Sequence, residues 1–178
     1  MNFSSKLDNG STDKNMLSNV IKSLEKVPAN INKIVFDIHN SMSELEVIQS
    51  FNQQTLDLFS LVTFITNKMN RSKEYNFSAY KQLFDTAIKI NVKFPIDQFA
   101  LSILVFSADI YSENEEIFLN MDLPDKKLNI GNEFSMIRSE EFKTLWKKLG
   151  ETDKKSIKDQ IILLTIYAHA YFYKAIIK

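Results

Sequence analysis

The 178-residue chain contains no cysteine, and this absence excludes several kinds of site at once. Disulfide scaffolds, zinc sites with thiolate ligands, iron–sulfur clusters and cysteine nucleophiles all need a sulfur atom that the chain lacks. A domain of this length buries roughly 68–70% of its unfolded surface, so it needs no cross-link to be stable. We therefore expect an ordinary hydrophobic core and no cofactor.

Glycine and proline are also scarce, with three of each in the whole sequence. An all-β sandwich or barrel needs many more turn residues than this. Apolar residues recur instead at steps of three and four, which is typical of helices that bury one face. The longest such stripe consists of Ile48, Phe51, Thr55, Leu58, Val62, Ile65 and Met69. The sequence predicts an all-α fold, in which residues 13–178 form a single helical bundle of about six to eight helices behind a polar N-terminal tail, residues 1–12.

Polar residues that favour helix N-termini mark where several helices should begin. Pro95 suits the first turn of a helix that carries Ile96, Phe99, Ala100, Ile103, Ser107 and Ile110 on one face. Gly150 should end the preceding helix in the left-handed conformation. The expected N-caps are Thr12 or Asp13, Ser43, Ser78, Ser139, and Thr152 or Asp153.

Motifs for phosphate and metal binding are missing from the sequence. The three glycines are scattered, so no glycine-rich phosphate loop is present, and there is no His-Glu-x-x-His pair. His39 and His169, the only histidines, come from opposite ends of the chain. A lone histidine near an apolar helix face usually serves as a hydrogen-bonded structural residue. We expect that role for both, and we expect no enzymatic activity.

The net charge is zero, but the charges are unevenly distributed. Residues 94–125 contain seven acidic and no basic side chains, whereas residues 126–178 contain eleven basic and six acidic ones. If the two segments are in contact, their charges neutralise each other; if they are apart, the molecule has two poles that attract charged partners. The acidic patch comprises Asp109, Glu113, Glu115 and Glu116, and the basic patch comprises Lys143, Lys147, Lys148, Lys154, Lys155 and Lys158.

The acidic patch suggests one alternative function. On a continuous helix, Asp109, Glu113 and Glu116 would share a face, and with His39 or His169 they could hold a divalent ion for catalysis. The simpler expectation is a solvated acidic face or one neutralised by lysines.

The basic patch suggests a second alternative, a low-specificity nucleic-acid-binding protein with Trp146 as a stacking platform. However, Trp146 shares an apolar helix face with Phe142, Leu145 and Leu149, which directs the indole toward the core. The sequence also contains only two arginines, the preferred residues for phosphate and guanine contacts. Nucleic-acid binding is therefore not favoured.

The last predicted helix raises the question of a membrane span. No charged residue occurs between positions 160 and 173, a stretch of 14 residues. Such a stretch reaches about 21 Å, which is short of a ~30 Å hydrocarbon layer. We expect a buried central helix rather than a span, and with no signal peptide at the N-terminus we expect a cytoplasmic protein.

Over residues 94–173 the sequence predicts a tryptophan-containing amphipathic helix, a short turn with lysines, and a closing helix rich in aromatic residues. The positions that carry this pattern are Phe94, Pro95, Ile96, Phe99, Ile117, Phe118, Leu119, Phe142, Leu145, Trp146, Leu149, Lys154, Ile157, Leu164, Tyr167, Ala168 and Tyr171. In these features the C-terminal half resembles uncharacterised α-helical proteins of nucleocytoplasmic large DNA viruses. The chain departs from their pattern where Lys158, not a second tryptophan, follows Ile157.

That resemblance implies a viral protein, located in the host cytoplasm or in the virion, and it implies no catalytic residues. Together with the missing catalytic and cofactor motifs, it favours a non-enzymatic structural or protein–protein interaction protein. We expect the partner to be a protein, and the oligomeric state stays open.

Overall fold

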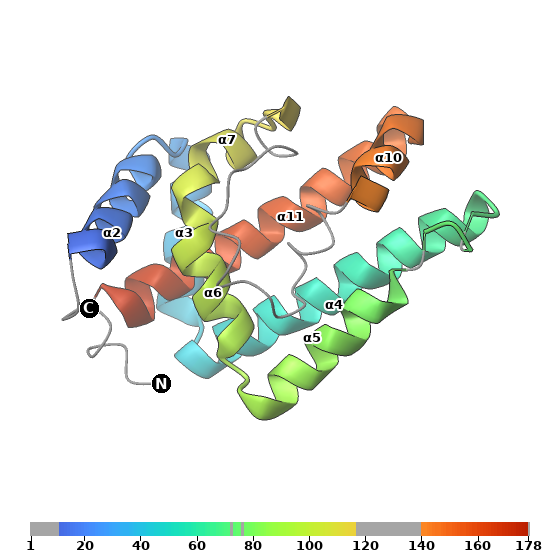
Figure 1. The fold of residues 1–178 in the computed structure, drawn as a ribbon. Coiled ribbons are helices and arrows are strands. Elements are labelled where there is room, and N and C mark those ends of the chain that lie inside the picture. Colours follow the sequence, from blue (N-terminus) through green and yellow to red (C-terminus); the bar gives the residue numbers. More distant parts are fainter. Residues whose placement is uncertain (1–10, 72, 76, 117–139, 178) are drawn as a thin grey trace.

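The computed structural model describes residues 11–71, 73–75, 77–116 and 140–177, and within them it contains helices and no strand. The predicted all-α class is confirmed. Short connections join most of the helices (Figure 1). The α-helices are α2 (Ser11–Leu24), α3 (Ala29–Ser41), α4 (Glu44–Lys68), α5 (Ser78–Ile90), α6 (Phe94–Ser102), α7 (Ser107–Tyr111), α10 (Glu140–Lys148) and α11 (Glu151–Tyr171), with a 3₁₀ turn η1 (Leu104–Phe106) and a π-helical turn η3 (Phe172–Ile176).

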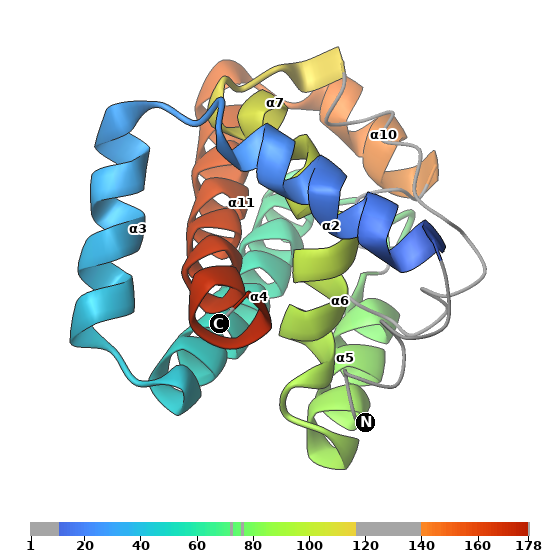
Figure 2. The ribbon, with the colours of Figure 1, turned by 90° about the vertical axis from the view of Figure 1, so that its left-hand side faces the viewer.

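Helix α11 forms the centre of the bundle. It packs against α4 along much of its length and also against α3, α6 and α7. Figure 2 shows α3 on one side of α11 and α2 with α6 on the other. The C-terminal half of α11 is buried, including Leu164, Ala168 and Tyr171. The uncharged stretch at residues 160–173 therefore lies at the centre of the bundle, as the sequence predicted.

Helix α4 begins at a capping box. The Ser43 hydroxyl accepts a hydrogen bond from the Glu46 N–H at 3.1 Å, and the Glu46 carboxylate accepts one from the Ser43 N–H at 2.7 Å. These contacts satisfy two N–H groups that the helix geometry leaves open. The predicted stripe on α4 is the core face, since all of its residues except the half-buried Met69 are buried.

The helix that begins near Pro95 is interrupted. Pro95 lies in the first turn of α6 as predicted, and the whole predicted face from Ile96 to Ile110 is buried. However, the chain passes from α6 through η1 into the short α7, which ends at Tyr111. The apolar periodicity thus predicted the buried face but not the breaks between α6, η1 and α7, because each of these short segments keeps the same side toward the core.

Several predicted helix ends are wrong by a few residues. Helix α2 starts at Ser11, so Thr12 and Asp13 lie inside the helix, and α5 starts at Ser78 itself with Phe77 at the N-cap position. Gly150 is extended (φ −73°, ψ 165°) and is the N-cap of α11, which places Thr152 and Asp153 in its first turn. Ser139 lies outside the described residues.

Candidate functional site

The acidic and basic segments meet where the chain after α7 approaches α10 and α11. Glu115 from the acidic patch contacts Trp146, Lys154 and Lys158. Trp146 lies on the buried face of α10 with Phe142 and Leu145, as its spacing predicted. The two lysines are one turn apart on α11, so both side chains reach the same point.

The Glu115 carboxylate uses both of its oxygens in this cluster. Its Oε1 accepts a short hydrogen bond from the indole Nε1–H of Trp146 and lies 3.7 Å from the Lys154 ammonium. Its Oε2 lies 3.5 Å from the Lys158 ammonium. The two ammonium groups also lie 5.7 and 5.9 Å from the centre of the indole ring, within the range of cation–π attraction.

The cluster holds Glu115 in its ionised form. The hydrogen bond from Trp146 lowers the pKa of the Glu115 carboxyl, and the nearby Lys154 and Lys158 lower it further, whereas burial opposes them. A carboxylate with a lowered pKa is a poor general acid at neutral pH. The arrangement is suited to binding and positioning charge, not to proton transfer.

The remaining acidic residues do not form the shared face that the sequence suggested. Helix α7 ends at Tyr111, and Glu113 has a left-handed backbone (φ 58°), so Asp109, Glu113 and Glu116 are not on one continuous helix. Among the residues that the structure describes, no three His, Asp or Glu side chains are placed to hold a metal ion. The geometric premise of the divalent-metal alternative is therefore wrong.

Most of the basic patch is paired with carboxylates. Besides the lysines at Glu115, Lys143 lies 3.6 Å from Glu140 and Lys155 lies 3.2 Å from Asp159. The Lys148 ammonium lies 5.6 Å from the centre of the Tyr75 ring, and Lys147 is exposed. The structure thus brings the two charged segments together at one corner, which partly neutralises both.

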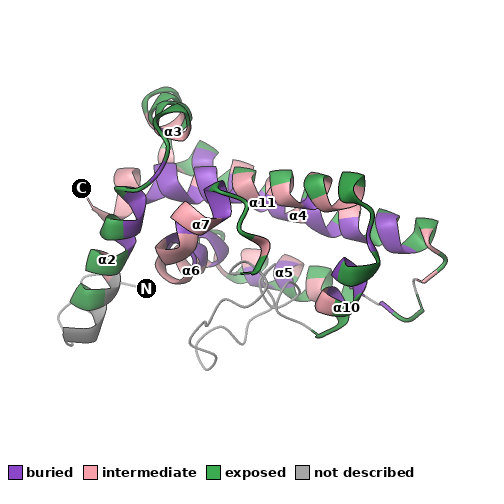
Figure 3. Ribbon diagram, turned by 90° about the horizontal axis from the view of Figure 1, so that it is seen from above, coloured by how far each residue is buried: buried purple, intermediate pink, exposed green. Residues whose placement is uncertain are grey.

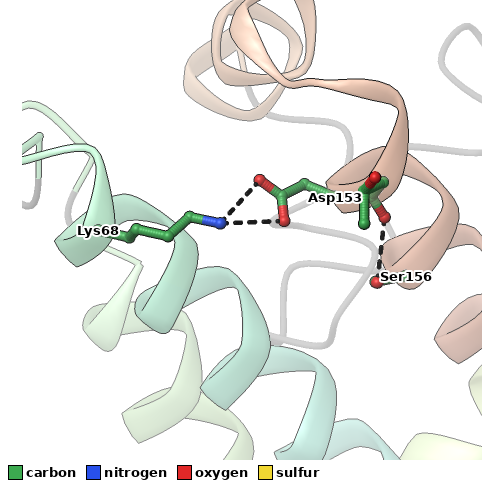
Figure 4. Close-up of polar contacts among 4 residues, drawn as sticks. Lys68, Asp153 and Ser156 are labelled. Atoms are coloured by element: carbon green, nitrogen blue, oxygen red, sulfur yellow. Dashed lines mark hydrogen bonds and ion pairs between the residues drawn. The ribbon is translucent and has the colours of Figure 1, made fainter.

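A further ion pair ties α4 to α11. The Lys68 ammonium near the end of α4 lies 3.2 Å from the Asp153 carboxylate in the first turn of α11 (Figure 4). Lys68 is about half exposed, so water weakens this pair.

The two histidines occupy contrasting environments. His169 is fully buried in α11, and its Nδ1 is 3.2 Å from the Tyr111 hydroxyl, whereas its Nε2 has no hydrogen-bond partner among the residues that the structure describes. Burial lowers the pKa of His169 to about 4, so the ring is neutral. His39, in the last turn of α3, is half-buried with its Nδ1 3.2 Å from the Asn40 side chain. Each histidine thus has a hydrogen-bond partner through Nδ1, as expected of structural histidines.

Sequence reasoning missed a second buried polar contact. The Tyr171 hydroxyl of α11 donates a short hydrogen bond to the Asp97 carboxylate in the first turn of α6. Burial raises the pKa of Asp97, and the hydrogen bond from Tyr171 opposes that shift. A tyrosine in an uncharged, buried helix usually needs a polar partner, and that was the available signal.

The structure also bears on the predicted absence of a membrane span. No single helix in the described ranges is long and apolar enough to cross a membrane. One pair of helical segments, Phe94–Ser102 with Leu104–Tyr111, meets the length and composition criteria together but is bent by 42°.

Comparison with known proteins gives one clear similarity. The chain is 46% identical over 171 residues to "Uncharacterized protein R465" of Acanthamoeba polyphaga mimivirus, which covers 96% of this chain and 95% of that protein. No model of a known protein family and no solved structure matches the chain.

Proposed function

The chain belongs to the family of this giant-virus protein, and on that premise we propose that it is a non-enzymatic viral protein that binds another protein. We propose that it acts in the host cytoplasm or in the virion. The name of the relative states no activity, so the support comes from the surface of the chain itself.

The observation that supports the proposal is a group of exposed apolar side chains where α4 begins and α5 ends, which we call the α4–α5 end. Ile90 is 81% exposed and Leu45 is 55% exposed. The two positions belong to the same corner, because Glu44, next to Leu45, pairs with Lys93 at 3.5 Å. Leu83 extends the exposed apolar face along α5, since it lies two turns before Ile90.

Large apolar side chains gathered on a surface are typical of sites that bind other proteins. Helix α5 packs against α4 and α6 and buries Phe84 and Ala87, whereas Leu83 and Ile90 are uncovered by the described residues. Nucleic-acid binding has less support, because four of the six lysines in the basic patch, Lys143, Lys154, Lys155 and Lys158, already have carboxylate partners.

The test is a comparison of three tagged proteins exposed to lysate from cells that produce the protein naturally. These are the wild type, a double variant Leu45→Ser with Ile90→Ser, and a control Phe64→Ser with Leu163→Ser, which removes exposed apolar groups elsewhere. We expect one partner to be enriched by the wild type and the control and lost with the double variant. Equal enrichment by all three proteins, or binding of nucleic acid that disappears only at high salt, would contradict the proposal.

A further inference from the structure

Helices α10 and α11 direct three hydrogen-bond donors to one point. The donors are the indole N–H of Trp146 and the ammonium groups of Lys154 and Lys158. Trp146 is 1% exposed, and the lysine side chains are only 16% and 20% exposed. Both ammonium groups also lie over the indole ring, so cation–π attraction adds to the contacts that hold the donors together.

The acceptor comes from a different part of the molecule. Glu115 follows the end of α7 after the left-handed residue Glu113, so it is not carried by either of the helices that supply the donors. Its side chain is 39% exposed, about twice as much as either lysine. The carboxylate is therefore the most exposed member of the cluster.

We propose that Trp146, Lys154 and Lys158 form a carboxylate-binding site that Glu115 fills from within the chain, and that an acidic side chain of a partner protein can take its place. Lys154 also lies 3.9 Å from the Glu151 carboxylate, but that side chain is 92% exposed, so water screens this pair more than the pair with Glu115. The choice of carboxylate follows from the geometry, because the three donors are shared between the two oxygens of one planar group.

A small hollow of about 10 Å³ adjoins the cluster, lined by Ile110, Glu113, Asn114, Glu115, Lys158 and Ile161. It has room for about one water molecule.

The test uses Glu115→Ala, which empties the site, together with added acetate. Trp146 is the only tryptophan, so its fluorescence and its indole N–H resonance in proton NMR both report on the site alone. We expect the substitution to move the indole resonance upfield and to lower the melting temperature. Acetate up to roughly 100 mM, at constant ionic strength, should move the indole resonance back toward its wild-type chemical shift. It should also reverse at least half of the decrease in melting temperature.

Three further sets of substitutions complete the acetate test. Glu113→Gln, which changes a neighbouring exposed carboxylate, should show no acetate effect. Adding Lys154→Met and Lys158→Met to Glu115→Ala should remove the rescue. Glu115→Ser replaces Glu115→Ala if the alanine variant does not fold. The site is overturned if acetate has no effect, if chloride works equally well, or if inorganic phosphate rescues more strongly than acetate.

The exchange with a partner rests on the proposed function and is tested separately with a hexaglutamate peptide. We expect Glu115→Ala to bind the peptide about tenfold more tightly than the wild type, because no internal carboxylate competes. Equal affinities would overturn the exchange. The two proposals can fail separately. A negative acetate result would not bear on partner binding at the α4–α5 end, and a negative partner-binding result would not change the interpretation of the acetate rescue.

Discussion

Helices α11 and α3 have similar apolar content but very different burial. In the C-terminal half of α11, Leu164, Thr165, Ala168 and His169 have no exposed surface. In α3, Val35 is the one fully buried residue, while Ile34 and Phe36 are 44% and 47% exposed. Figure 3 shows the contrast, with exposed and half-buried residues around α3 and buried ones along α11. An apolar stripe shows which side of a helix faces inward, but the number of neighbours determines how much of that side is covered.

The most direct test of this difference in burial is to shorten one aliphatic side chain on each helix. Leu164→Ala should lower the free energy of unfolding by about 2–5 kcal/mol, because it leaves a cavity among helices that cannot collapse to fill it. Ile34→Ala should lower it by less than about 1 kcal/mol, because the lost surface is already in contact with water. Urea denaturation of both variants measures the difference. Similar losses would mean that α3 is as much a part of the core as α11.

The second prediction concerns the effect of acid on His169, in the buried part of α11. The folded-state pKa of His169 is about 4, below the ordinary value of 6.5, so the unfolded chain binds more protons between these values. Stability should therefore fall as the pH drops from about 6.5 to about 4, by on the order of 3 kcal/mol.

Denaturation at a series of pH values measures this effect. His169→Gln should flatten the profile in that window, and Ser60→Ala, an exposed change on α4 that removes no titratable group, should leave it as in the wild type. An unchanged profile in the first variant would show that other groups cause the acid sensitivity.

The third prediction concerns how firmly α3 is attached. The Phe36 ring stacks on Tyr173, with centroids 5.6 Å apart, and the Lys174 ammonium donates to the His39 carbonyl at 2.8 Å. Phe36→Ala should lower the free energy of unfolding by about 1 kcal/mol. It should also speed hydrogen exchange of the α3 amides while leaving the protected amides of α11 almost unchanged. Faster exchange in both helices would show that α3 and α11 open as one unit.

The smallest effect is expected at the exposed N-terminal end of α11. Lys68→Ala removes the ion pair with Asp153, and a pair at this exposure contributes less than about 1 kcal/mol. Ser60→Ala, an exposed change on the same helix, is the control. Thermal melting at low and high salt should show a small loss that disappears at high salt. A loss as large as that of Leu164→Ala would mean that charge pairing, not burial, holds α11 in place.

Local sequence patterns determined a large part of this protein. The spacing of apolar residues predicted the helices, the buried faces of α4 and α6, and the inward direction of Trp146, because each of these depends on residues within a few turns. The capping box at Ser43 was predictable for the same reason. The exact ends at Gly150 and Ser78 were not, because several neighbouring residues can serve as caps.

The tertiary structure alone decided which helix became central and which polar groups met. Glu115 and Trp146 are 31 residues apart, His169 and Tyr111 are 58 apart, and Asp97 and Tyr171 are 74 apart. Helical periodicity carries no information about such pairs, since it describes one helix at a time. Their formation follows from how α6, α7, α10 and α11 pack, and the same packing brings Glu115 of the acidic segment to Lys154 and Lys158 of the basic segment.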